Sequence, residues 1–173
     1  MPTTARERKS QLLGDLVAVR QDILASANTF SPEQAAVIFL GSWAVGDLIA
    51  HLIGWDVTNM QAAQDILTDQ LPRFYAFHDR DWQTFNARLV AEYKKDQLSE
   101  LIADASASHQ QLLALLETIP AEEFERDRGL RFRGWKVTIA RLLRAEADDE
   151  QKHLTQLRAF VIDTSQTYGD TDE

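Results

Sequence analysis

Apolar residues recur every three or four positions in four long stretches of the chain, and polar residues fill the positions between them. That spacing places the apolar side chains on one face of an α-helix. The four stretches cover residues 7–27, 43–67, 98–119 and 135–162. The pattern therefore predicts four long amphipathic helices.

Two shorter segments carry signals for the start of a helix. Ser31 is a capping residue type, Pro32 suits the first helical position, and Gln34 can complete a capping box. We expect a short helix here, up to about Phe39. Asp81 follows an aromatic stretch and is expected to cap a further helical segment.

The rest of the chain shows no sign of strands or of a second domain. No stretch alternates apolar and polar residues, and no internal repeat or low-complexity linker occurs. Residues 122–134 are charged and contain two glycines, which is typical of a loop, with a short turn expected at 121–124. The polar and acidic residues 163–173 are expected to form a frayed tail. The sequence thus predicts one all-α domain over 1–173, a four-helix bundle with short accessory helices.

Composition narrows the choice of partners and cofactors. The formal net charge of -9 repels phosphates and anionic lipids over most of the surface, so we expect no nucleic-acid and no membrane partner beyond a local basic patch. The chain has no cysteine, so a metal would be held by nitrogen and oxygen ligands, and any thiol would belong to a substrate. The start of the chain has no apolar run of signal-peptide length, and we expect a cytoplasmic protein.

The last predicted long helix carries ionisable residues on its apolar face. Glu146, Glu150 and His153 fall inside the apolar sector and Asp149 lies at its edge. Such groups are costly to bury unless they are paired, hydrogen-bonded or bound to a cation. An arginine from another helix is one possible partner. A metal ion is the other, because Asp149 and His153 have the i, i+4 spacing, and Glu150 and His153 the i, i+3 spacing, of helical metal sites.

The other histidines give weaker signals. His51 lies at the margin of the apolar stripe on the second predicted long helix, one turn from both Asp47 and Trp55, where a helix-packing or surface role is more typical than a ligand. His78 in the connecting loop and His109 on the third helix have no ligand-spaced neighbour, and we interpret both as structural.

Three segments together resemble a known family. GSWAVGDLIAHLIGWD at 41–56, GWKVTIARLL at 134–143 and DEQKHLTQLR at 149–158 occur in the order and at the separation of the signatures of the DinB/YfiT-like superfamily of metalloenzymes. The likeness extends over nearly the whole chain. It implies a four-helix bundle, and it suggests a homodimer, since the apolar stripes need not all be satisfied within one chain.

The resemblance also implies a metal centre. His51 and His153 fall on two of the family's three ligand positions, and Asp149 falls on the third, where a histidine is usual. Zinc or nickel is the expected divalent ion, and Glu146 and Glu150 are candidates for a general base or for residues that orient the ligands. The implied function is a metal-dependent enzyme that carries out thiol transfer, isomerisation or hydrolysis on a small organic molecule.

A different function is implied by the ClbS/DfsB-like branch of the same superfamily, which this chain resembles in size and in the AHLIGW segment, and which lacks a complete metal triad. The chain would then be a metal-free small-molecule-binding or resistance protein, with the polar stripe satisfied by Arg141 or Arg144. In either case we expect the pocket between the helices to be lined by Trp55, Trp82, Phe85 and Asn86.

Basic residues concentrate near the start of the last predicted helix. The favoured interpretation is a solvated segment balanced by Glu122, Glu123, Glu125 and Asp127. The alternative is a rim that recognises the carboxylate of a substrate such as a low-molecular-weight thiol. The basic residues are Arg126, Arg128, Arg131, Arg133, Lys136, Arg141 and Arg144.

Overall fold

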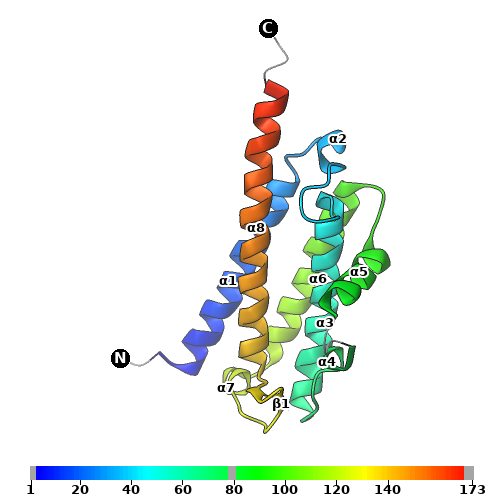
Figure 1. Cartoon of the computed structure of the whole chain (residues 1–173). Helices are drawn as coiled ribbons and strands as arrows, with labels where there is room; N and C mark the ends of the chain where they lie inside the picture. The colour runs from blue at the N-terminus through cyan, green and yellow to red at the C-terminus, as the bar shows by residue number, and fades with distance from the viewer. Residues whose placement is uncertain (1–2, 78–80, 170–173) are drawn as a thin grey trace.

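Four long helices form the bundle that the hydrophobic pattern predicts (Figure 1). The computed structural model describes residues 3–77 and 81–169. The four long helices are α1 (Ala5–Ala27), α3 (Val45–Leu67), α6 (Leu98–Thr118) and α8 (Ile139–Gly169). The short elements are α2 (Pro32–Ala35), α4 (Phe74–Phe77), α5 (Trp82–Tyr93), α7 (Ala121–Phe124), β1 (Arg131–Phe132) and β2 (Trp135–Lys136). The predicted all-α class is confirmed.

The predicted helix starts are present. The Ser31 side chain accepts a hydrogen bond from the Gln34 backbone, and the Gln34 side chain accepts one from the Ser31 backbone, so the capping box of α2 is complete. Asp81 accepts a hydrogen bond from the backbone N–H of Thr84 and caps α5. Helix α2 ends at Ala35, before the predicted end near Phe39.

The segment predicted as a loop and helix start contains a small hairpin instead. Strands β1 and β2 pair antiparallel, with Phe132 opposite Trp135. Arg133 and Gly134 both have positive φ, which is the conformation that a tight two-residue hairpin turn requires. Strands of two residues are too short to produce an alternating pattern, so they could not be predicted from the spacing of apolar residues. As a result α8 begins at Ile139 rather than at 135.

The end of α8 also differs from the prediction. The helix continues to Gly169, so much of the segment expected to be a frayed tail is helical. Residues 170–173 and His78 lie outside the described residues. Within the described part of the chain, no helix is both long and apolar enough to cross a membrane.

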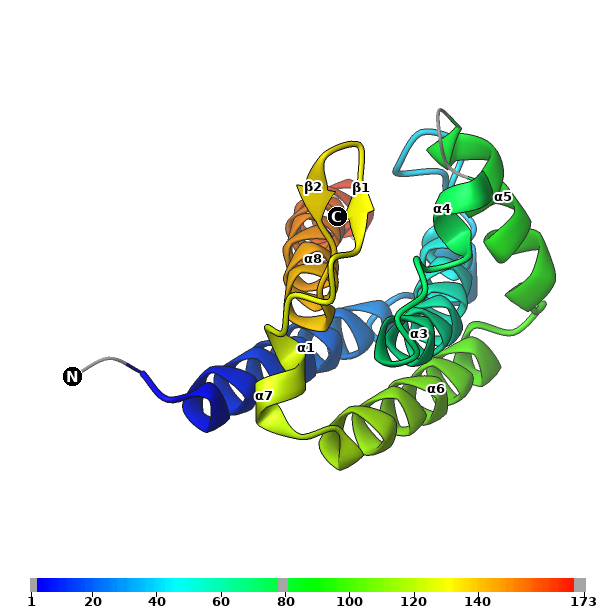
Figure 2. The ribbon, with the colours of Figure 1, turned by 90° about the horizontal axis from the view of Figure 1, so that it is seen from below.

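The elements of the bundle form two groups that face each other, which we call the two walls. Seen from below, α8 and the hairpin lie on one side and α3, α4 and α5 on the other, and α1 and α6 run along the lower edge of the view (Figure 2). Gly54 allows the close approach of α5 to α3, because a Cβ at this position would lie only 2.7 Å from the Cβ of Leu89. The glycine therefore determines how closely α5 packs against α3.

Candidate ligand pocket and metal centre

A cavity of about 600 Å³ lies between the two walls. One wall is formed by α8 and the hairpin, and the other by α3, α4 and α5. The rings of Tyr75 and Phe132 stack across the gap with their centroids 4.1 Å apart, so they join the walls at the hairpin end. We call this space the aromatic cavity, after the six rings that line it: Trp55, Phe74, Tyr75, Trp82, Phe132 and Trp135.

Three of the four residues predicted to line a pocket do so. Trp55 and Asn86 are joined by a hydrogen bond of 3.2 Å from the indole N–H to the amide oxygen, and Trp82 lies beside Trp55. Phe85 is buried behind Trp55, with 5.6 Å between ring centroids, and does not line the aromatic cavity. The hairpin rings, Phe132 and Trp135, were missed because the hairpin itself was not predicted.

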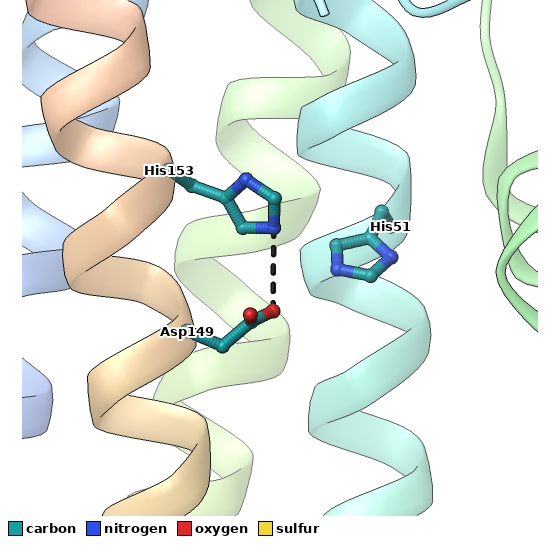
Figure 3. Close-up of side chains that lie close together, drawn as sticks. All are labelled: His51, Asp149 and His153. Atoms are coloured by element: carbon teal, nitrogen blue, oxygen red, sulfur yellow. Dashed lines mark ion pairs between the residues drawn. The ribbon is translucent and has the colours of Figure 1, made fainter. Parts of the chain in front are cut away.

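The three predicted metal ligands lie together beside the cavity. His51 comes from α3, and Asp149 and His153 come from α8, with their side chains directed into the space between the two helices (Figure 3). One ligand atom from each residue lies within 4.8 Å of the others. His51 and Asp149 also line the aromatic cavity. We refer to these residues as the triad.

His153 contacts an amide and a carboxylate through its two ring nitrogens. Its Nδ1 lies 3.0 Å from the side-chain oxygen of Gln156, and its Nε2 lies 3.3 Å from a carboxylate oxygen of Asp149. The hydrogen bond with His153 lowers the pKa of Asp149 below its usual range.

His51 is buried in the core rather than exposed at the margin of a helix. It is 2% exposed, and its Nδ1 has no hydrogen-bond partner. Burial, together with nearby His153 and Arg20, lowers the pKa of His51 to about 3, so its ring is neutral. The Trp43 ring lies 4.8 Å away and covers one side of it. A neutral imidazole with an unsatisfied nitrogen is in the state that a metal ligand requires.

The triad fits a divalent ion in both chemistry and size. Two imidazoles and one carboxylate are a suitable donor set for zinc or nickel. Three ligand atoms bound at roughly 2.0–2.3 Å to one tetrahedral ion lie about 3.3–3.8 Å apart. The three atoms now lie within 4.8 Å of one another. Their separations would therefore have to decrease by at most about 1.5 Å around an ion.

Glu150 is paired with an arginine from another helix, which was one of the two partners considered from the sequence, but this arginine is Arg20. Its carboxylate accepts hydrogen bonds of 2.6 and 3.0 Å from Arg20 on α1, and both side chains are buried. Arg144 pairs with Glu125 on the surface, and Arg141 lies over the Trp135 ring, so the predicted partners Arg144 and Arg141 were wrong. Glu150 is held by Arg20 and does not line the cavity. It is therefore not placed to act as a general base on a molecule in the cavity.

Arg20 is also paired with α3. It donates to both carboxylate oxygens of Asp56 at 2.8 and 3.0 Å, and Ser108 on α6 donates to the same carboxylate. We call Arg20, Asp56 and Glu150 the buried ion cluster. Arg20 was missed, although its spacing from Leu16 places it on the apolar face of its helix, which is the signal that could have revealed it.

Glu146 remains a candidate for the general base. It lines the aromatic cavity, one turn before Glu150 on α8. Burial and the nearby negative charge of Glu150 raise the pKa of Glu146 to about 8. A carboxyl group with such a pKa can accept or donate a proton near neutral pH.

The basic segment is largely neutralised by its own acidic residues. Arg128 pairs with Glu123, and both Arg131 and Lys136 pair with Asp127.

His109, interpreted as structural, is buried on α6 with Nδ1 3.5 Å from Asp56.

The comparisons with known proteins agree with the resemblance seen in the sequence. The model of the DinB superfamily matches residues 15–157, so the chain belongs to this superfamily. The crystal structure of colibactin self-resistance protein ClbS in complex with a dsDNA matches with a TM-score of 0.74 at 18% identity, over 88% of this chain and 94% of that one. An uncharacterised protein from Escherichia coli UTI89 matches with a TM-score of 0.72 at 16% identity, over 91% and 94% of the two chains. No curated protein matches the sequence.

One of these structures corrects an expectation. We expected no nucleic-acid partner from the net charge, but the ClbS structure, which has the same fold, is a complex with dsDNA. Excluding a nucleic-acid partner on the basis of net charge was wrong, because net charge is a sum over the whole molecule, whereas phosphate contacts depend on local charge.

Proposed function

We propose that this protein binds a small, largely apolar organic molecule in the aromatic cavity, as a resistance or sequestration protein would. The observation that carries the proposal is the cavity itself, with six aromatic rings around about 600 Å³ and with Glu146 and Asp149 among its lining residues. Cavities of this size, with mostly apolar walls and few polar groups, are typical of small-molecule sites. The self-resistance role in the name of ClbS, a protein of the same fold, supports this class of function.

A binding measurement tests this proposal directly. We expect 2-naphthol, a neutral aromatic probe, to bind in calorimetric titrations and to bind at least tenfold more weakly to Trp82→Ala, which removes one wall ring. Ile38→Ala serves as the control, because Ile38 is exposed and does not line the cavity. The proposal would be contradicted if 2-naphthol did not bind to the unaltered protein. It would also be contradicted if Trp82→Ala bound 2-naphthol as tightly as Ile38→Ala does.

A second candidate is a metal-dependent enzyme that acts on the bound molecule. It is favoured by the convergence of the ligand atoms of His51, Asp149 and His153 and by the unsatisfied Nδ1 of His51. A divalent ion held there would lower the pKa of a bound water or thiol. Glu146 lines the same cavity and is suited to hold or release a proton beside the ligand. Metal analysis of protein purified without an affinity tag separates the candidates: stoichiometric zinc or nickel supports the enzyme, and background levels support the metal-free binding protein.

A further inference from the structure

We propose that the aromatic cavity selects organic cations, meaning ligands with an apolar or aromatic body and a positively charged nitrogen that lies beside Glu146. This inference rests on the proposed function and names the class of ligand. Three features of the structure carry it: the charge count behind the cavity, the unpaired state of Glu146, and the rings that surround it.

The interior behind the cavity has fewer cations than carboxylates. Arg20 is the one arginine or lysine of the buried ion cluster, and it is shared between Asp56 and Glu150. Glu146 adds a third carboxyl group next to this cluster, where the charge of Glu150 already opposes its ionisation. A positive charge brought into the cavity would relieve this repulsion.

Glu146 has no protein cation of its own. Among the described residues it forms no ion pair, whereas Asp149, the other carboxylate that lines the cavity, faces His153. The fully buried amide of Asn59 lies beside Glu146, and its hydrogen bond opposes the rise in the pKa of Glu146. A neutral amide brings no positive charge, so a cationic ligand can supply the charge that Glu146 lacks.

The rings complete the recognition of a cation. Trp55 and Trp82 line the cavity, and the faces of indole rings attract cations more strongly than those of other aromatic side chains. Lys136 and Arg141 also line the cavity but have other partners, since Lys136 lies 3.1 Å from Asp127 and Arg141 lies over Trp135. They therefore leave Glu146 available.

Three probes of similar size test the proposal on chelator-treated protein, so that no metal ion occupies the triad. They are phenyltrimethylammonium, its neutral isostere tert-butylbenzene, and benzoate. We expect the ammonium probe to bind at least tenfold more tightly than the isostere and benzoate to bind most weakly. In Glu146→Gln this preference should fall below about threefold, whereas Glu117→Gln, an exposed residue on α6, should keep it.

The outcomes separate this inference from the proposed function. If the isostere binds as tightly as the ammonium probe, or benzoate binds best, the cation selectivity is wrong and the small-molecule site stands. Retention of the full preference in Glu146→Gln also overturns the inference. If none of the probes binds, the proposed function fails as well. The comparison of probes on the unaltered protein needs no variant, so it remains decisive even if Glu146→Gln does not fold.

Discussion

The guanidinium of Arg20 on α1 and the carboxylate of Glu150 on α8 are joined by two buried hydrogen bonds across 130 positions of sequence. The same guanidinium holds Asp56 on α3. The neighbouring turns of α3 and α8 carry the triad. Arg20 therefore fixes the two helices that position the candidate ligands, although it lies on a helix that contributes none of them.

We expect Arg20→Met to be strongly destabilising, because it leaves Asp56 and Glu150 buried without a cation. Breaking a buried pair from one side costs roughly 3–5 kcal/mol. Urea unfolding measures the loss. Arg158→Met is the matched control, because the Arg158–Asp22 pair is exposed and should contribute at most about 1 kcal/mol. A loss below about 1 kcal/mol in Arg20→Met would show that the cluster adapts to the missing charge.

The triad makes a prediction about metal content. His153→Ala should abolish zinc binding, since it removes one of three ligands, and Asp149→His should tighten it, because imidazole is a better-matched ligand for a borderline metal. Zinc titration of the chelator-treated protein, followed by elemental analysis, provides the measurement. The control is Asp148→His, which places the same new side chain at the neighbouring exposed position. If Asp149→His gains no more zinc than Asp148→His, the three residues do not form a metal site.

Glu146 should make the stability of the protein depend on pH. Its pKa is raised from 4.5 to about 8 in the folded state, so the folded state favours the protonated form. Stability is then greatest below the unfolded pKa and declines as the pH rises from about 4.5 to 8. Glu146→Gln removes this dependence. The free energy of unfolding of the variant minus that of the unaltered protein should increase by at least about 1 kcal/mol between pH 5 and pH 8.5. Urea unfolding at both pH values checks this, and a constant difference would contradict it.

Gly54→Ala tests the close approach of α5 to α3. The added Cβ would lie 2.7 Å from the Cβ of Leu89, so the helices must separate. We expect a loss of roughly 1–3 kcal/mol on unfolding, weaker binding of aromatic probes and a change in the fluorescence of Trp82. Gly14→Ala is the control, because nothing lies within 4 Å of its new Cβ, and it should stabilise α1 by roughly 0.5–1 kcal/mol. Equal stability of the two variants would show that α5 adjusts without cost.

The homodimer suggested by the superfamily resemblance stays a prediction. Val37 and Ile38 are adjacent exposed apolar residues that a second copy could cover. Light scattering at high protein concentration should give twice the mass of one chain, and Ile38→Lys should reduce it if this surface is involved. A single-chain mass for the unaltered protein would rule the dimer out.

Local spacing was sufficient to predict the four long helices and the capping residues, because both depend on neighbours within one or two turns. The grouping of Asp149 and His153 followed from their i, i+4 spacing, whereas the addition of His51 depended on the resemblance to a family. Arg20 could not be paired with Glu150 from the sequence, since an arginine on a charged helix is usually solvated and its partner lies on the last helix. The rings of the hairpin were missed because its strands are too short to produce a pattern.

The stacked rings of Tyr75 and Phe132 join the two walls of the cavity through short elements rather than through the long helices. Tyr75 belongs to a single helical turn and Phe132 to a two-residue strand. Substitutions or insertions in these connections can therefore enlarge or narrow this end of the cavity while the bundle keeps its packing. The fold thus allows related chains to acquire different ligands without redesign of their cores.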